Sequence, residues 1–82
     1  MNILSAINGA SEILKKNHIH SAKLDSEILL SKVMKKDRKY IILNSDKELE
    51  NEYVISFNKL IAKRSLGQPI AYLIGKKDFW KY

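Results

Sequence analysis

The spacing of apolar residues along the chain predicts a series of short amphipathic helices. Over the first sixteen residues, apolar side chains recur three and four positions apart, which gives a helix one buried stripe. This stripe consists of Ile3, Leu4, Ile7, Ala10, Ile13 and Leu14. The pattern predicts a first helix from Ile3 to Lys16.

A second helix is predicted after a polar break at residues 17–20. Ser21 is expected to cap it by accepting a hydrogen bond from a free backbone N–H. Asp25 and Glu27 suit the positive first turn of such a helix, and Lys35 and Lys36 suit its negative last turn. Its apolar positions are Leu24, Ile28, Leu29 and Val33.

Two further helices follow in the central part of the chain. Asp37 is expected to cap a short helix from Arg38 to Leu43, which would bury Tyr40 and either Ile41 or Ile42. Ser45 and Glu48 form a capping-box pattern at the start of the longest helix. The expected inner face of that helix comprises Leu49, Tyr53, Phe57, Leu60, Ile61 and Arg64, and its first two turns would gather Asp46, Glu48, Glu50 and Glu52.

The last part of the chain predicts a change from helix to strand. Gly67 is expected to end the long helix, Pro69 to begin a short one that runs to Ile74, and Gly75 to end that one. Residues 77–82 then alternate as in a strand, and a lone strand leaves its backbone groups unpaired. The predicted fold is therefore an all-α bundle of four to five helices over residues 1–75. Residues 76–82 would begin a β-hairpin that a following segment completes.

Composition sets limits on size and compartment. The 82 residues suffice for one small domain, and no cysteine is present, which favours a core held by apolar packing in a reducing compartment such as the cytoplasm. The apolar runs are far shorter than the roughly 20 residues that a bilayer span requires, so no membrane segment is expected.

The formal charge of +6 is compatible with a nucleic-acid surface or with an acidic protein partner. Only Arg38 and Arg64 offer the planar fork suited to bidentate base or phosphate contacts, because the other thirteen basic residues are lysines. Nucleic-acid binding is thus disfavoured, but a small basic helical nucleic-acid-binding module remains the main alternative. A self-associating helical bundle is another.

Chemistry-bearing residues are sparse. His18 and His20 lie in a polar break without a nearby acidic or cysteine partner, which favours a solvated turn over a metal site. Three isolated glycines cannot form a phosphate-cradling or dinucleotide-binding loop. No catalytic, cofactor-binding or metal-binding residue is predicted. Arg64, on the apolar side of its helix, would need an acidic partner, for which Asp25 is the candidate.

One segment contains a combination of residues that helix propensity alone does not explain. It runs from Arg64 through Gly67, Gln68, Pro69, Tyr72 and Gly75 to Phe79 and Trp80. This segment resembles the R-x-x-G-E/Q-P-x-A-Y-L-x-G-x-x-E/D-F signature of the HemK-type (PrmC) release factor glutamine methyltransferases. Residues 21–30, SAKLDSEILL, resemble a second helix of the same family. Gln68 stands where that family often has glutamate, and Ser26 where it often has alanine.

The resemblance implies a helical N-terminal domain that precedes a Rossmann-like domain, which binds S-adenosylmethionine and holds the catalytic residues. It implies that the full-length enzyme methylates the side-chain amide nitrogen of the glutamine in the Gly-Gly-Gln loop of class 1 peptide chain release factors. This chain would then be inert alone and would serve as the recognition arm. Its signature residues are expected to be structural, with Tyr72, Phe79 and Trp80 packing the linker. The positive charge at the ends of two helices, and not the resemblance, suggests candidate contacts to an acidic surface of the release factor, namely Lys35, Lys36, Arg38, Lys39 and Lys63. The alternative is that these charges only keep the protein soluble.

Overall fold

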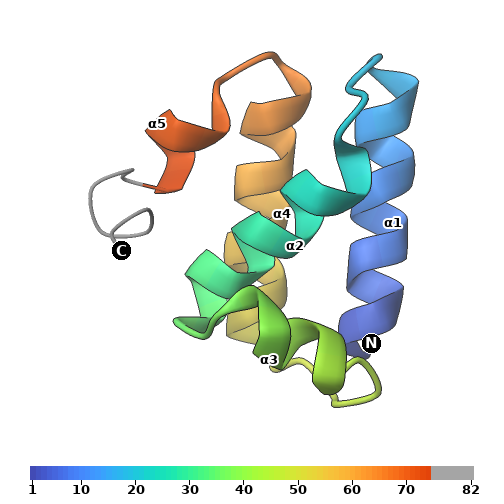
Figure 1. Ribbon diagram of the computed structural model, residues 1–82, viewed down its shortest axis with the longest axis vertical. Helices are drawn as coiled ribbons and strands as arrows, with labels where there is room; N and C mark the ends of the chain where they lie inside the picture. Colours follow the sequence, from blue (N-terminus) through green and yellow to red (C-terminus); the bar gives the residue numbers. More distant parts are fainter. Residues whose placement is uncertain (75–82) are drawn as a thin grey trace.

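The computed structural model describes residues 1–74, and within that range it contains five helices and no sheet (Figure 1). The helices are α1 (Ile3–Lys16), α2 (Ala22–Met34), α3 (Arg38–Leu43), α4 (Asn51–Ser65) and α5 (Ile70–Ile74). The predicted helical bundle is thus confirmed. The predicted strand lies outside the described residues, together with Gly75, Phe79 and Trp80.

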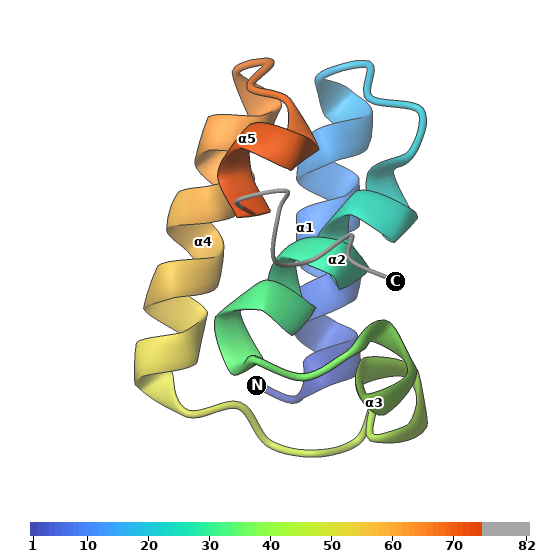
Figure 2. The same cartoon turned by 60° about the vertical axis from the view of Figure 1, so that its left-hand side comes forward.

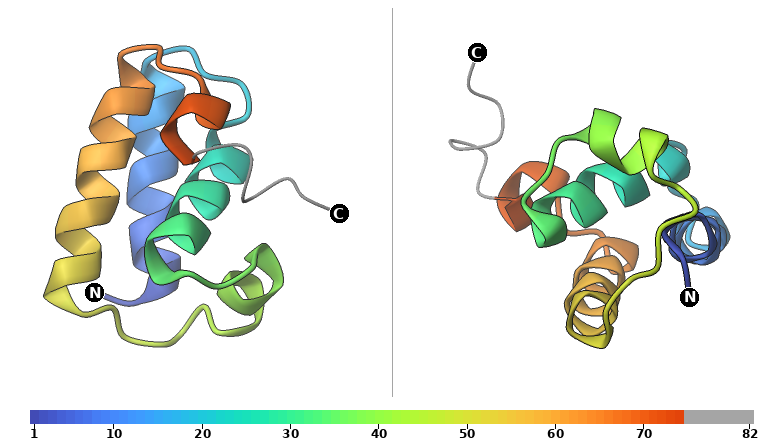
Figure 3. Two further views of the ribbon diagram at one scale, coloured as in Figure 1. Left: turned by 90° about the vertical axis from the view of Figure 1, so that its left-hand side faces the viewer. Right: turned by 90° about the horizontal axis from the view of Figure 1, so that it is seen from below.

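The helix α2 is the centre of the bundle and contacts all four other helices. The helices α1 and α4 run in the same direction, and α2 lies across them (Figure 1). Seen from below, α1 and α4 point along the line of sight, whereas α2 and α3 lie across it (Figure 3). Because α2 is covered on several sides, even its Ser26 and Ser31 are buried, and their hydroxyls donate to the carbonyls of Ala22 and Ile28.

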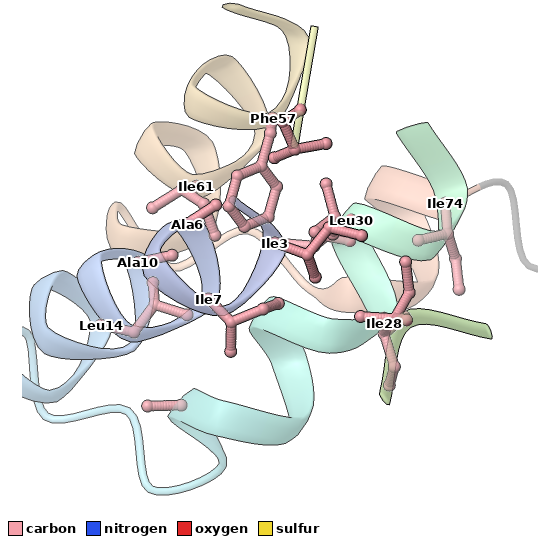
Figure 4. Close-up of a cluster of buried hydrophobic side chains, with 14 residues drawn as sticks. Ile3, Ala6, Ile7, Ala10, Leu14, Ile28, Leu30, Phe57, Ile61 and Ile74 are labelled. Carbon is pink, nitrogen blue, oxygen red and sulfur yellow. The ribbon is translucent and has the colours of Figure 1, made fainter. Parts of the chain in front are cut away.

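The hydrophobic core lies where α1, α2 and α4 meet (Figure 4). Phe57 and Ile61 of α4 face the α1 side chains, and Ile74 closes the side that α5 covers. The predicted burial of Phe57, Ile61 and Ile41 is confirmed. Apolar packing of these three helices brings the start of α2 and the end of α4 close together.

Several residues of the predicted apolar stripes are exposed instead. Leu4 and Ile13 of α1 are about half exposed, because α1 packs mainly on α2 and α4 and its buried stripe is narrower than the sequence suggested. Ser11 takes a buried position on that stripe. Leu24 lies on the solvent side of α2, and Ile42 is exposed whereas its neighbour Ile41 is buried.

Two helices begin with side-chain caps. The Asp37 carboxylate accepts from the Tyr40 N–H at 2.9 Å, which confirms its predicted role at the start of α3. The Asn2 side chain does the same for α1 and accepts from the Ser5 N–H at 2.8 Å. Ser21 occupies the expected capping position of α2, but the predicted hydrogen bond was wrong, because its hydroxyl donates to Asp25 instead.

The predicted start of α4 at a Ser45–Glu48 capping box was wrong. Residues 45–49 form an irregular segment whose backbone pairs with the start of α1. The carbonyls of Ser45 and Lys47 accept from the N–H groups of Leu4 and Ile3, and the Leu49 N–H donates to the Met1 carbonyl. These contacts satisfy N–H groups that the first turn of a helix leaves unpaired. Asp46, Glu48 and Glu50 therefore precede α4, and Glu52 is the one acidic residue in its first turn.

The ends of α2 and α4 use left-handed backbone. Gly67, at φ +100°, ends α4 as predicted, and the N–H groups of Gly67 and Gln68 donate to the carbonyls of Arg64 and Lys63. The helix α2 ends at Met34, so Lys35 and Lys36 follow its last turn rather than form it. Lys35 adopts φ 57° there, a conformation that glycine tolerates better than lysine.

Candidate functional site

The candidate site is the junction where α4 ends and α5 begins, because the signature segment folds against α2 there (Figure 2). Arg64 Nε donates to Asp25 Oδ2 at 2.9 Å, which confirms the predicted ion pair between α4 and α2. The side chains of Asp25 and Arg64 are 6% and 20% exposed. Removal of one partner of such a pair lowers the free energy of unfolding more than removal of a surface partner, because a buried charge would be left without a partner.

Further hydrogen bonds extend this pair into a network. The Ser21 hydroxyl donates to the same Asp25 oxygen at 2.9 Å, and Arg64 Nη1 donates to the Gln68 carbonyl at 3.0 Å. Arg64 therefore joins the start of α2, the end of α4 and the turn that leads to α5. The planar guanidinium can make both contacts at once because its donors point in fixed, divergent directions.

A second ion pair on α2 was missed by the reasoning from sequence. Arg38 Nε of α3 donates to Glu27 Oε1 at 3.0 Å, and Glu27 is buried. The sequence pattern indicates for Glu27 only that it suits the first turn of α2. A signal was present, since the chain has two arginines and two carboxylates directly precede the apolar run of residues 28–30. Each arginine satisfies one of these buried carboxylates.

The remaining described signature residues shape the turn. Gln68 contributes its carbonyl to Arg64, while its side-chain Oε1 is buried and has no hydrogen-bond partner among residues 1–74. Pro69 directly precedes α5, and its carbonyl accepts from the N–H groups of Tyr72 and Leu73. Tyr72 is 75% exposed, so its expected packing against the linker depends on residues outside the described range.

The five basic candidates for partner contacts lie at two separate places on the bundle. Lys35, Lys36, Arg38 and Lys39 lie at the end of α2 and the start of α3, whereas Lys63 lies near the other end of the bundle. Arg38 is held by Glu27, and Lys36 Nζ lies 5.2 Å from the centre of the Tyr40 ring. Lys35, Lys39 and Lys63 are exposed, and no ion pair involves them within residues 1–74.

The surface of residues 1–74 contains hollows on either side of α2. One of about 500 Å³ lies between α2 and α4 and is lined by Lys32, Val33, Glu52, Tyr53, Ser56, Lys59 and Leu60. Another of about 210 Å³ lies between α1, α2 and α3, and exposed Leu4 and Ile42 contribute to its lining. Neither hollow includes a residue of the Arg64 network.

The described residues bring no catalytic constellation together. His18 and His20 are both exposed, and His18 adopts φ 63° in the turn after α1. Within residues 1–74, no three His, Cys, Asp or Glu side chains are grouped so that they could hold a metal ion. In the same range, no helix has the length and apolar character needed to cross a bilayer.

Comparison with known proteins identifies the family. A family model described as the PrmC N-terminal domain matches residues 5–75. The release factor glutamine methyltransferase of Buchnera aphidicola subsp. Schizaphis graminum is 46% identical over 83% of this chain and 25% of its own length. That of Buchnera aphidicola subsp. Acyrthosiphon pisum is 42% identical, and that of Vibrio cholerae 36%, each over 98% of this chain and 28% of its own length. No solved structure matches the chain.

Residues 1–74 form a small helical bundle of five helices, and the family match specifies which class of helical domain this is. This chain belongs to the PrmC N-terminal domain family. It spans about a quarter of the length of the curated relatives that it matches.

Proposed function

We propose that this chain is the substrate-recognition domain of a methyltransferase that modifies peptide chain release factors. The observation that carries the proposal is the family match over residues 5–75, together with relatives that are named release factor glutamine methyltransferases. The modified group would be the side-chain amide nitrogen of the glutamine in the Gly-Gly-Gln loop of a class 1 release factor. The compartment of translation, the cytoplasm, would be its location.

The methyl group would come from S-adenosylmethionine bound by a C-terminal methyltransferase domain. The described residues do not fit this cofactor themselves, because Gly9 lies within α1 and Gly67 closes α4, so neither belongs to a glycine-rich binding loop. Each of the two hollows has lysine and glutamate side chains in its lining and no glycine. We therefore assign cofactor binding and catalysis to a C-terminal methyltransferase domain.

A rigid bundle suits recognition of a large substrate. Contacts far from the reacting glutamine can be converted into correct orientation of the loop, provided that the contacting surface does not move relative to the catalytic cleft. The basic residues supply the chemistry for contacting an acidic protein surface. All five side chains are exposed, and Lys35, Lys39 and Lys63 are best placed because no ion pair or cation–π contact within residues 1–74 holds them. Lys36 and Arg38 would contribute positive charge from side chains already held by neighbours.

A truncation experiment tests this function. Methyl transfer by the full-length protein is compared with transfer by a version that lacks residues 1–75, using an intact release factor and a short glutamine-loop peptide. A recognition domain predicts a much larger loss of kcat/KM for the intact release factor than for the peptide. Equal losses for both substrates would show a scaffold for the catalytic domain, and no loss for either would refute the proposed function.

The alternative of a nucleic-acid-binding module is disfavoured by the charges near α4. Asp46, Glu48, Glu50 and Glu52 are exposed and gather before and within the first turn of α4, where they would repel phosphates. Salt-sensitive binding to duplex DNA or RNA at a dissociation constant well below that for the release factor would favour the alternative instead.

A further inference from the structure

We propose that Arg64 is a positioning residue that fixes the direction in which the chain leaves the bundle through α5. This role goes beyond an ion pair that merely stabilises the fold. Its effect on methyl transfer rests on the proposed function, whereas its effect on α5 does not.

The first step of the argument is that Arg64 makes two contacts that point to different parts of the chain. Nε donates to Asp25 Oδ2 on α2 at 2.9 Å, and Nη1 donates to the Gln68 carbonyl at 3.0 Å. The carboxylate itself is held by the Ser21 hydroxyl at 2.9 Å. The turn before α5 is thereby fastened to the start of the central helix and not only to the end of α4.

The second step is that α5 is held at both of its ends. Ile74, its last residue, is fully buried, and α5 contacts α2 as well as α4. At the other end, the Gln68 carbonyl accepts from Arg64, while the Gln68 side-chain Oε1 is buried without a hydrogen-bond partner among the described residues and so adds no contact. Two fixed points define the direction of a helix as short as Ile70–Ile74. Loss of the Arg64 contact would leave the turn before α5 held only to the end of α4, through the N–H groups of Gly67 and Gln68, and no longer to α2.

The third step separates this role from simple stabilisation. The Glu27–Arg38 pair has the same chemistry and a similar distance of 3.0 Å, but it joins α2 to α3 and does not touch the turn before α5. The fold therefore contains a second arginine–carboxylate pair that serves as a control, although the Arg38 side chain is 47% exposed and that of Arg64 is 20% exposed. If both arginines acted only through the global stability of the fold, substitutions that lower the free energy of unfolding equally would change exchange in α5 equally.

The test uses Arg64→Lys and Arg38→Lys in the full-length protein. A lysine ammonium keeps the charge but cannot reach the Asp25 carboxylate and the Gln68 carbonyl with the geometry of a guanidinium. Amide hydrogen exchange is measured at Tyr72 and Leu73, whose N–H groups donate to the Pro69 carbonyl, and at core positions of α1. Arg64→Lys is expected to speed exchange in α5 by about tenfold while α1 is unchanged, whereas Arg38→Lys leaves α5 exchange at its original rate.

Methyl transfer supplies the second readout. Arg64→Lys is expected to lower kcat/KM for the intact release factor by about tenfold, mainly through kcat, with little effect on the peptide, because a misdirected exit misaligns a substrate held by both domains. Ile61→Val on the same helix serves as a control that loosens the core without touching the turn. If Arg64→Lys speeds α5 exchange but the wild-type protein does not methylate release factors, the proposed function is refuted. The role of Arg64 in α5 is then still supported. Unchanged α5 exchange, or an equal effect of Arg38→Lys on α5, would overturn the inference.

Discussion

Asp25 and Arg64 are 39 residues apart in sequence and form an ion pair of 2.9 Å between α2 and α4. Asp25 is the more deeply buried partner, so removal of Arg64 leaves a carboxylate that only the Ser21 hydroxyl satisfies. Removal of Asp25 leaves a guanidinium that still reaches solvent. The two positions are therefore not equivalent for stability.

We predict that Arg64→Gln lowers the free energy of unfolding by about 3–5 kcal/mol, the usual cost of leaving a buried charge unpaired. Asp25→Asn is expected to cost less, because the amide can still accept from Arg64. Urea unfolding followed by circular dichroism measures both. Losses below about 1 kcal/mol for each variant would place the pair among ordinary surface ion pairs and contradict its buried character.

Substitution of Phe57 tests which face of α4 is buried in the core. It is 1% exposed, and Phe57→Ala is expected to destabilise the fold by about 3–5 kcal/mol through lost apolar burial and the cavity left behind. Ile55 lies on the same helix but is 56% exposed, so Ile55→Ala should change stability by no more than about 0.5 kcal/mol. Thermal unfolding of the two variants side by side gives the comparison, and similar midpoints would refute the assigned face of α4.

Lys35 offers a stabilising substitution. Its φ of 57° costs a residue with a side chain about 1 kcal/mol relative to glycine, so Lys35→Gly should raise the free energy of unfolding by roughly that amount. Lys39→Gly removes the same type of side chain within α3 and should lower stability by about 1 kcal/mol. A destabilising effect of Lys35→Gly in chemical denaturation would mean that α2 does not end in the left-handed conformation.

Substitution of Asp37 and of Ser45 distinguishes the cap seen in the structure from the capping box that the sequence pattern predicted. Asp37→Ala should cost about 1 kcal/mol, because the carboxylate accepts from the Tyr40 N–H. Ser45→Ala should cost less than about 0.5 kcal/mol, since the Ser45 backbone carbonyl, and not its side chain, contacts the first turn of α1. If Ser45→Ala proved as costly as Asp37→Ala in equilibrium unfolding, the capping box expected from sequence would exist after all.

The sequence predicted the helices that local signals define. Asp37 and Gly67 act within one turn of their own positions, so their roles in capping and ending helices could be inferred from residue type alone. The start of α4 could not, because residues 45–49 pair with the first turn of α1 across more than 40 positions. No local pattern records that partner, and the side chains that suggested a capping box belong to an irregular segment.

The candidate site was predicted in part for a similar reason. An arginine on an apolar helix face needs a carboxylate, and this requirement identified Asp25 as the partner of Arg64. The pair of Glu27 with Arg38 was not predicted, because Glu27 also suits the positive first turn of α2 and its burial is not evident from the sequence. The contact from Arg64 to the Gln68 carbonyl could not be predicted either, because it depends on the path of the backbone after Gly67.

The most direct test of substrate recognition is amide hydrogen exchange of the full-length protein with and without an intact release factor. Recognition by this domain predicts slower exchange within residues 1–74 on binding, concentrated around Lys35 and Lys39 or around Lys63. If exchange slowed only in the C-terminal domain while residues 1–74 exchanged at the same rate, this domain would not contact the release factor and the proposed function would be wrong.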